Sequence, residues 1–245
     1  MNPQDSITLT ILTATFNSSA VIGRLIASLE AQTDADFEWL VVDGASSDDT
    51  LARIANARLA RKTVVSEPDF GVYDALNKGV CRASGDYYLV VGADDTLAPE
   101  AVANFRRAVA GAAPAPDLVS AHVESAGRDC QALRRRPWLY GMQAYVSAHS
   151  VGTLIRRDLH DRFGLYSRKF PIGADQYFIK RAAQGGARIL YADFRAGSFS
   201  QEGVSSVDVA GTLTEFFRVQ LATERGRLRQ VLLFLLRLAR HYRSL

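Results

Sequence analysis

The sequence contains few residues that could form cross-links or bind structural zinc. Among its 245 residues only Cys81 and Cys130 are cysteines; they are far apart and show no CxxC or Cys/His ligand spacing. This pattern argues against a zinc-stabilised fold and is typical of a reducing, cytosolic compartment.

Long apolar runs are also missing. The longest covers residues 231–236, whereas a membrane-spanning helix needs about 18 apolar residues. The first ten residues, MNPQDSITLT, contain neither a basic nor an apolar segment, so we expect no secretory signal there. The sequence therefore predicts a cytoplasmic protein.

Three common active-site motifs are absent as well. No GxGxxG follows the first apolar segment, which excludes the phosphate turn of a dinucleotide-binding Rossmann domain. The chain has no GxxxxGK[ST] phosphate loop and no GxSxG nucleophile elbow.

The composition nevertheless predicts a well-packed globular chain. Hydrophobic residues make up 48% of the sequence, enough to bury a full core. The net charge is only +3, but arginines gather toward the C-terminus among few acids. That asymmetry indicates an anionic surface or partner at one end of the protein.

Strand and helix patterns alternate through the first half. Apolar, β-branched segments predict strands over residues 7–16, 37–43, 62–66 and 87–91. The intervening segments predict helices. Asn17, Ser18 and Ser19 offer N-cap oxygens for the first helix, and residues 47–49 can cap a second one that ends near Leu59. Pro99 is expected as the first residue of a later helix. This order implies a parallel sheet with right-handed crossovers.

The alternation weakens beyond the Pro/Ala connector at residues 112–117. Residues 118–123 and 130–136 are candidate strands of a mixed sheet, and residues 175–184 have a helical pattern that ends at Gly185. We therefore predict one α/β domain over residues 1–206, with halves at 1–111 and 112–206, and a helical segment at 207–245.

Four carboxylates are expected near one edge of the sheet. Asp43 and the pair Asp94 and Asp95 follow predicted strands, and Asp69 follows a third. Ligands in such sheets bind beyond the carboxyl ends of the strands. Clustered acids repel one another unless a cation lies among them, and Mg²⁺ or Mn²⁺ would also bind a diphosphate. Asp43 could separately accept a hydrogen bond from a nucleobase N–H or a ribose hydroxyl.

Several segments together resemble the family 2 glycosyltransferases, an inverting group with the GT-A fold. They are TATFNS, VVDGASSDDT, SEPDFGVYDALNKG and ASGDYYLVVGADD in the first half, and HSVGTLIRRDL, FGLYSRKFPIGADQYFIKRA and FSQEGVSS in the second. The resemblance is in particular to the branch found in bacterial exopolysaccharide and lipopolysaccharide assembly. The likeness covers about residues 7 to 206 and implies a Rossmann-like, mainly parallel mixed sheet flanked by helices.

The resemblance assigns donor-binding roles to residues of the first half. Thr13, Thr15 and Asn17 would line the pocket for the base and ribose, Asp43 would hold the nucleobase, and Asp69 would flank it.

The resemblance also assigns the metal and the base. Asp94 would bind the divalent metal as the final acid of the DxD motif, with Asp95 beside it, and Asp175 would remove the proton from the acceptor hydroxyl. Two positions depart from the pattern: Gly92 replaces the first DxD acid, which predicts weaker metal binding, and Ala174 replaces a frequent Glu.

Simpler roles stay open for several of these residues. Asp94, Asp95 or Asp175 could cap a helix. Lys78 could reach phosphates or be solvated, and His149 could serve the acceptor side or be an ordinary hydrogen-bonded histidine.

The basic segment at residues 225–243 predicts an amphipathic helix. Its apolar face could lie on the anionic inner face of the cytoplasmic membrane, pack on the catalytic domain or pair with a second copy. No recognition motif for nucleic acid accompanies its arginines.

The leading hypothesis is a metal-dependent enzyme that moves a sugar, with inversion, from a UDP-sugar to a hydroxyl of a glycan or lipid-linked saccharide. The alternative is a non-catalytic module that binds nucleotide sugars or polysaccharides. A nucleotidyltransferase would need a Gly-rich, Arg-containing loop after the first strand, and TATFNS contains neither residue.

Overall fold

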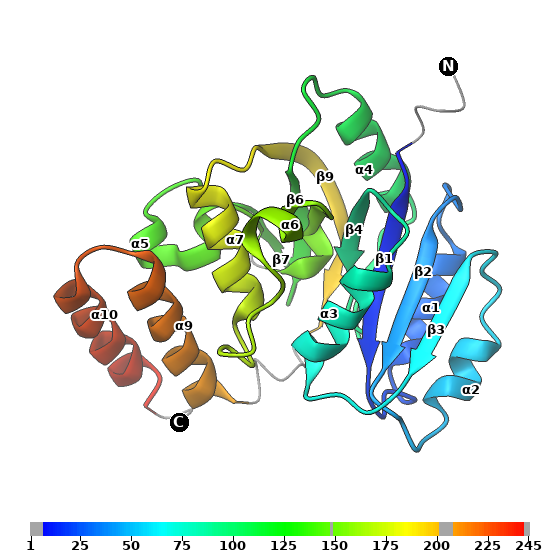
Figure 1. Cartoon of the computed structure of the whole chain (residues 1–245), viewed down its shortest axis with the longest axis horizontal. Helices are drawn as coiled ribbons and strands as arrows, with labels where there is room; N and C mark the ends of the chain where they lie inside the picture. The colour runs from blue at the N-terminus through cyan, green and yellow to red at the C-terminus, as the bar shows by residue number, and fades with distance from the viewer. Residues whose placement is uncertain (1–6, 148, 201–207, 243–245) are drawn as a thin grey trace.

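Figure 1 shows the computed structural model, which describes residues 7–147, 149–200 and 208–242. Its first half alternates strands and helices as predicted: β1 (Leu9–Thr15), α1 (Ile22–Glu30), β2 (Glu38–Asp43), α2 (Thr50–Ala55), β3 (Lys62–Ser66), α3 (Val72–Arg82), β4 (Tyr87–Val90) and α4 (Ala101–Ala110). All pairings among β1 to β4 are parallel.

The second half completes the sheet with antiparallel and parallel pairings. Its strands are β6 (Leu118–Ser125), β7 (Arg128–Cys130), β8 (Thr153–Arg156) and β9 (Ile189–Phe199), and β9 also pairs with the short β5 (Thr96–Leu97) of the first half. The strand order is β3-β2-β1-β4-β8-β6-β9-β5, with β7 paired to β6. The predicted boundary at 111/112 falls between α4 and β6, and one continuous sheet extends across it.

The remaining elements are helical. They are α5 (Pro137–Tyr140), the 3₁₀ turns η2 (Gly141–Ala144) and η3 (Ser150–Gly152), α6 (Leu159–Phe163), α7 (Ala174–Gln184), α9 (Val209–Thr223) and α10 (Arg227–Arg240). Among the described residues, no helix is long and apolar enough to cross a membrane.

The hydrophobic core lies on both faces of the sheet. Because side chains alternate along a strand, Ile11 of β1 packs with Ile22 and Phe105 from α1 and α4, whereas Leu12 packs with Leu76 and Phe178 from α3 and α7. Burial on both faces explains why the polar residues of these strands are limited to threonines in β1 and to the two terminal acids, Glu38 and Asp43, in β2.

The predicted cap of α1 is wrong, because α1 begins only at Ile22, after Val21, and has no side-chain cap. At α2 the Asp49 side chain makes no cap bond, but Asp48 Oδ1 accepts the N–H of Thr50, the first residue of that helix, at 3.0 Å. The N–H groups of Ser18 and Ser19 instead donate to Thr50 Oγ1 and Asp48 Oδ2, which ties the loop after β1 to the loop after β2. Pro99 precedes Glu100, the N-cap residue of α4, and so lies outside the helix.

Two predicted elements are shorter than expected. Helix α2 ends at Ala55 rather than near residue 59. The strand predicted at 130–136 is wrong beyond Cys130. Arg134 and Arg136 have positive φ angles, 54° and 48°, which no strand accommodates.

Helices α9 and α10 pack against α7 and α5 at one end of the molecule (Figure 1). The buried Lys180 of α7 makes an ion pair with Glu224 at 2.6 Å, just after α9. Phe217 of α9 stacks on Phe234 of α10, with ring centroids 4.5 Å apart. The predicted helix at 225–243 is thus α10, separated from α9 by Gly226 at φ 85°.

Candidate active site

A cavity of about 190 Å³ lies where β4 ends. Its lining includes Asp94 and Asp95 after β4, His149 before η3, and Asp175 in the first turn of α7. The structure therefore brings together four predicted site residues from segments that are up to 81 positions apart in the sequence, from Asp94 to Asp175. Asp43, Asp69, Lys78 and the residues of TATFNS do not line this cavity.

The two adjacent acids have different roles. Asp95 is only 2% exposed and accepts hydrogen bonds from the N–H groups of Gly92 (3.0 Å) and Ser200 (2.9 Å). Burial raises the pKa of Asp95 to about 6, and the neighbouring Asp94 contributes to that rise. Asp95 therefore holds the loop, while Asp94 is the half-exposed carboxylate that the cavity offers to a ligand.

Gly92 is a glycine for a steric reason. A Cβ atom at this position would lie 2.8 Å from Asp95 Oδ2 and 3.0 Å from Asp94 Oδ1. Both carboxylates thus fold over its α-carbon. The departure from DxD is therefore part of the loop geometry, because an acid at position 92 would displace the acids that follow it.

Asp175 is held at the start of α7 by neighbours on both sides. Its Oδ1 lies 2.7 Å from the Tyr73 hydroxyl and accepts the N–H of Gln176 at 2.8 Å. In the described part of the chain no hydrogen bond reaches Oδ2. Burial raises the pKa of Asp175, the direction that makes a carboxylate a better proton acceptor near neutral pH.

The turn before Asp175 is fixed by α9. Glu215, which is 6% exposed, accepts hydrogen bonds from the N–H groups of Ile172 (2.9 Å) and Gly173 (2.8 Å) through one oxygen, Oε2. Sequence reasoning missed Glu215, because nothing in a helical pattern shows which turn a side chain will contact.

A buried polar chain backs the cavity, and sequence reasoning missed it too. Tyr166 lines the cavity, and its hydroxyl lies 2.8 Å from that of Tyr88, which lies 2.6 Å from His160 Nε2. Burial raises the pKa of both tyrosines, so these groups stay neutral. They make this wall rigid without adding charge to it.

His149 is partly buried and stacks on Phe199, with ring centroids 3.8 Å apart. Burial lowers the pKa of His149 to about 4, so the ring is neutral at physiological pH. A neutral imidazole in a cavity with Asp94 can donate to, or accept from, a bound ligand.

Asp43 lies at the end of β2 in a saturated network. Its fully buried carboxylate accepts hydrogen bonds from Thr15 Oγ1, Ser66 Oγ and both the N–H and hydroxyl of Ser46. These donors hold the pKa of Asp43 below its usual value although burial opposes them. Four donors fill the acceptor sites of a carboxylate, so a nucleobase would have to displace one of them.

The other predicted donor residues are dispersed around these strand ends. Thr13 is fully buried, and its hydroxyl accepts a hydrogen bond from Trp39 Nε1 at 3.1 Å, so its place in the base pocket stays a prediction. Asn17 accepts the N–H of Ser47, and Lys78 is engaged by Glu67 (3.2 Å) and Asp74 (3.4 Å).

An exposed aromatic residue lies beside Asp69. The Asp69 carboxylate packs over Gly44, where an added Cβ would be 2.7 Å from Oδ2 and 3.4 Å from the ring of Phe16. Phe16 is 65% exposed at the end of β1. It offers a flat apolar face next to an acid, and a bulky aromatic directly after a strand was the signal that could have identified it.

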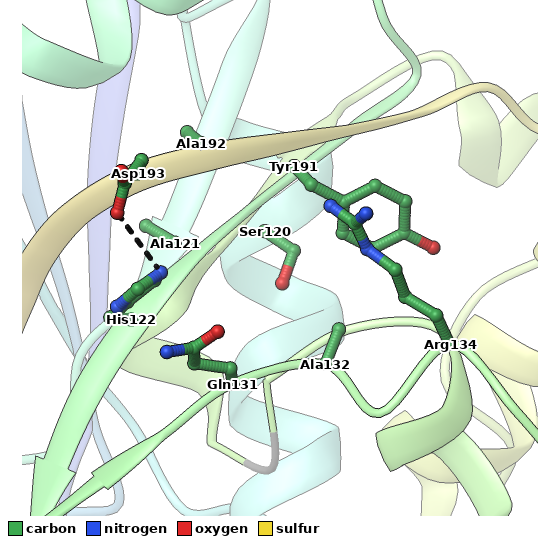
Figure 2. Close-up of a pocket in the computed structure, with 9 residues that line it drawn as sticks. All are labelled: Ser120, Ala121, His122, Gln131, Ala132, Arg134, Tyr191, Ala192 and Asp193. Atoms are coloured by element: carbon green, nitrogen blue, oxygen red, sulfur yellow. Dashed lines mark ion pairs between the residues drawn. The ribbon is translucent and has the colours of Figure 1, made fainter.

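A second, more open cavity of about 450 Å³ lies between β6, β9 and the segment after β7 (Figure 2). Its polar groups bind one another: His122 Nε2 lies 3.6 Å from Asp193 Oδ1, and the guanidinium of Arg134 lies 3.8 Å above the Tyr191 ring. It contains none of the predicted site residues.

Comparison with known sequences identifies the family. The profile of glycosyl transferase family 2 matches residues 10–168. The chain belongs to this family. An uncharacterized glycosyltransferase of Mycobacterium tuberculosis is 31% identical over 183 residues, which is 72% of this chain and 69% of that protein. The predicted family and the predicted enzyme class, a glycosyltransferase, are therefore confirmed.

Two other relatives match shorter parts of the chain and are named for biosynthesis of PGL/p-HBAD and of O-antigen. A PGL/p-HBAD biosynthesis glycosyltransferase of M. tuberculosis is 42% identical over 90 residues, 36% of this chain and 35% of that protein. An O-antigen biosynthesis protein of Myxococcus xanthus is 35% identical over 127 residues, 49% of this chain and 10% of that protein.

Solved structures confirm the GT-A fold. S. aureus TarS, in complex with UDP-GlcNAc, superposes with a TM-score of 0.69 at 19% identity, over 96% of this family 2 chain and 73% of TarS. The mannosyltransferase PcManGT of Pyrobaculum calidifontis, in complex with GDP-Man and Mn²⁺, gives 0.67 at 21% identity, over 91% and 67% of the two chains.

Proposed function

We propose that this glycosyltransferase moves a sugar from a nucleotide sugar to an acceptor hydroxyl and inverts the anomeric carbon. The observation that carries the proposal is that Asp94 and Asp175, from separate elements, line one cavity. Asp94 would hold the metal ion that binds the leaving diphosphate, and Asp175 would accept the proton of the acceptor hydroxyl.

The donor would bind across the carboxyl ends of β1, β2 and β4. Its base would stack on the exposed ring of Phe16 beside Asp69. The loop after β2, whose N–H groups donate to Asp43 and Asn17, would contact the ribose. TarS and glucosyl-3-phosphoglycerate synthase, which share the fold, have been solved with UDP, and PcManGT has been solved with GDP-Man; uridine is the base that we propose, and a donor panel with both bases tests it.

A divalent metal fits the residues at Asp94. Within the described ranges no three His, Cys, Asp or Glu side chains gather as a complete ligand set. Mg²⁺ and Mn²⁺ need no such set, since one or two carboxylates with substrate phosphates and waters suffice. Asp94, with His149 across the cavity, would hold such an ion, which would neutralise negative charge on the departing diphosphate.

Asp175 would act as the general base through Oδ2, while Tyr73 and the N–H of Gln176 orient the carboxylate through Oδ1. General base catalysis is worth about 10²- to 10⁴-fold, so Asp175→Asn should lose that factor in kcat and still bind the donor. Names of relatives support a surface glycan or lipid-linked saccharide as the acceptor class.

The deciding experiment measures nucleoside diphosphate release with UDP- and GDP-sugars, Mg²⁺ or Mn²⁺ and an acceptor panel. We expect Asp94→Asn and Asp175→Asn to abolish it, and Asp193→Asn, an exposed acid outside the cavity, to leave it intact. Full activity in both cavity variants would overturn the assignment. Donor binding by calorimetry without turnover on any acceptor would favour the alternative, a non-catalytic module, which Gly92 in the DxD position supports.

A further inference from the structure

Helix α10 turns its apolar side toward solvent. Its outward side chains are 39% to 74% exposed, and they are Leu228, Val231, Leu232, Leu235 and Leu236. Their spacing of three, four, seven and eight residues from Leu228 puts them on one side of the helix. We call this set the outer face of α10.

The inner face of the same helix carries polar groups. Gln230 is fully buried and donates to the carbonyl of Trp138 at 3.0 Å. Arg237 donates to the carbonyl of Leu139 at 2.8 Å and lies over the ring of Phe216. The helix therefore packs on α5 through polar contacts and on α9 through Phe234, while its outward leucines stay exposed, unlike those of an ordinary surface helix.

Arginines border the outer face, and no acid interrupts them. Residues 225–242 contain no Asp or Glu. At 100° per residue, Arg227 and Arg229 lie on opposite sides of Leu228, and Arg240 lies on the side of Arg229. All three are exposed, as is Arg225 just before the helix.

Further positive charge lies at the neighbouring helix. Arg134, Arg135 and Arg136 are exposed and immediately precede α5, whose backbone receives the bonds from Gln230 and Arg237. Two segments about 90 residues apart thus place arginines at one end of the molecule, where α5, α9 and α10 lie together (Figure 1).

We propose that the outer face of α10 docks on an anionic lipid bilayer, with the helix lying in the plane of the membrane surface. An apolar face rimmed by arginines matches such an interface, because leucines enter the acyl boundary while guanidinium groups meet lipid phosphates. A second copy fits less well, since a two-fold contact through this face would oppose the same arginines. The proposal is independent of the donor and of the catalytic residues.

The test measures binding of the full chain to sedimented vesicles of phosphatidylcholine with and without phosphatidylglycerol. We expect binding only with the anionic lipid and a loss of at least about a hundredfold in L232Q/L235Q/L236Q. The control V64Q/L165Q removes exposed apolar side chains elsewhere and should bind like the wild type.

A second pair of variants tests the charge. Each arginine near an anionic surface contributes about a fivefold gain in partitioning. We expect R227Q/R229Q/R240Q to bind these vesicles about a hundredfold more weakly than the wild type. The control R53Q/R58Q/R82Q loses the same charge at exposed positions on α2, the loop after it and α3. It should bind at least tenfold more tightly than R227Q/R229Q/R240Q.

Three outcomes would overturn the proposal: no binding to either vesicle, equal binding to both, or equal losses in the two arginine triples. A dimer in sedimentation velocity that L232Q/L235Q/L236Q dissociates, without vesicle binding, would assign the face to a second copy. Circular dichroism confirms that each variant is folded, and donor binding by calorimetry separates a failure here from a failure of the proposed function.

Discussion

Glu215 offers a sharp test of how the catalytic residue is positioned. Its Oε2 accepts the N–H groups of Ile172 and Gly173, immediately before Asp175, from a helix outside the sheet. Glu215→Ala would leave both N–H groups without their acceptor. Because each buried donor left unpaired costs about 1–3 kcal/mol, the turn would lose about 2–6 kcal/mol of support or move to regain it.

The expected result is a fall in kcat of about 100-fold, since a displacement of 1 Å in a catalytic group is enough for that loss. The dissociation constant of the donor should change little, because Glu215 does not line the cavity. Glu215→Gln keeps an oxygen acceptor, although a neutral and weaker one, and should recover most of kcat.

The pH profile separates positioning from simple destabilisation. The charge of Glu215 contributes to the raised pKa of Asp175, after the larger effect of burial. Glu215→Gln should therefore shift the acidic limb of the kcat profile to lower pH. The control is Asp208→Ala on the same helix, which removes the bond to the N–H of Gly211 and should cost about 1 kcal/mol of stability with kcat unchanged.

Steady-state kinetics with a saturating donor, together with urea unfolding, provides these values. If Glu215→Ala kept its kcat while its stability fell as in Asp208→Ala, α9 would have no part in positioning the base.

Three further predictions concern residues of the cavity and its support. Gly92→Ala should raise the Mn²⁺ concentration needed for half-maximal activity at least tenfold, because the added Cβ would push against Asp94 and Asp95. An unchanged Mn²⁺ titration would show that the loop tolerates a side chain. His149→Phe should reduce the loss of melting temperature below pH 6.5, because the folded pKa of about 4 lies below the unfolded value and the stability of the neutral ring is lost as pH falls toward 4; parallel melting curves would refute this. Lys180→Met should lower the free energy of unfolding by about 3–5 kcal/mol, since Glu224 would remain as a buried unpaired charge; urea unfolding measures it, and a loss below 1 kcal/mol would mean that Glu224 reaches water.

The sequence by itself determined the parallel part of the sheet and the family, and it predicted the edge where ligands would bind, whereas β5, β8 and β9 had no counterpart among the predicted strands. Apolar runs specify β1, β2 and β4, because a strand covered on both faces needs mostly apolar side chains, whereas β3 lies at the edge of the sheet with Val64 40% exposed. Asp94 and Asp175 were identified from local motifs, and the structure places both in one cavity.

Only the tertiary structure decided which neighbours each group has. It showed that Asp95 binds backbone N–H groups while Asp94 faces the cavity, and that Asp43 is already saturated by hydroxyls. Glu215 and the outward leucines of α10 depend on contacts between segments far apart in the chain. Local periodicity shows that a helix has an apolar side, but the packing of the other elements decides whether that side faces the core or the solvent.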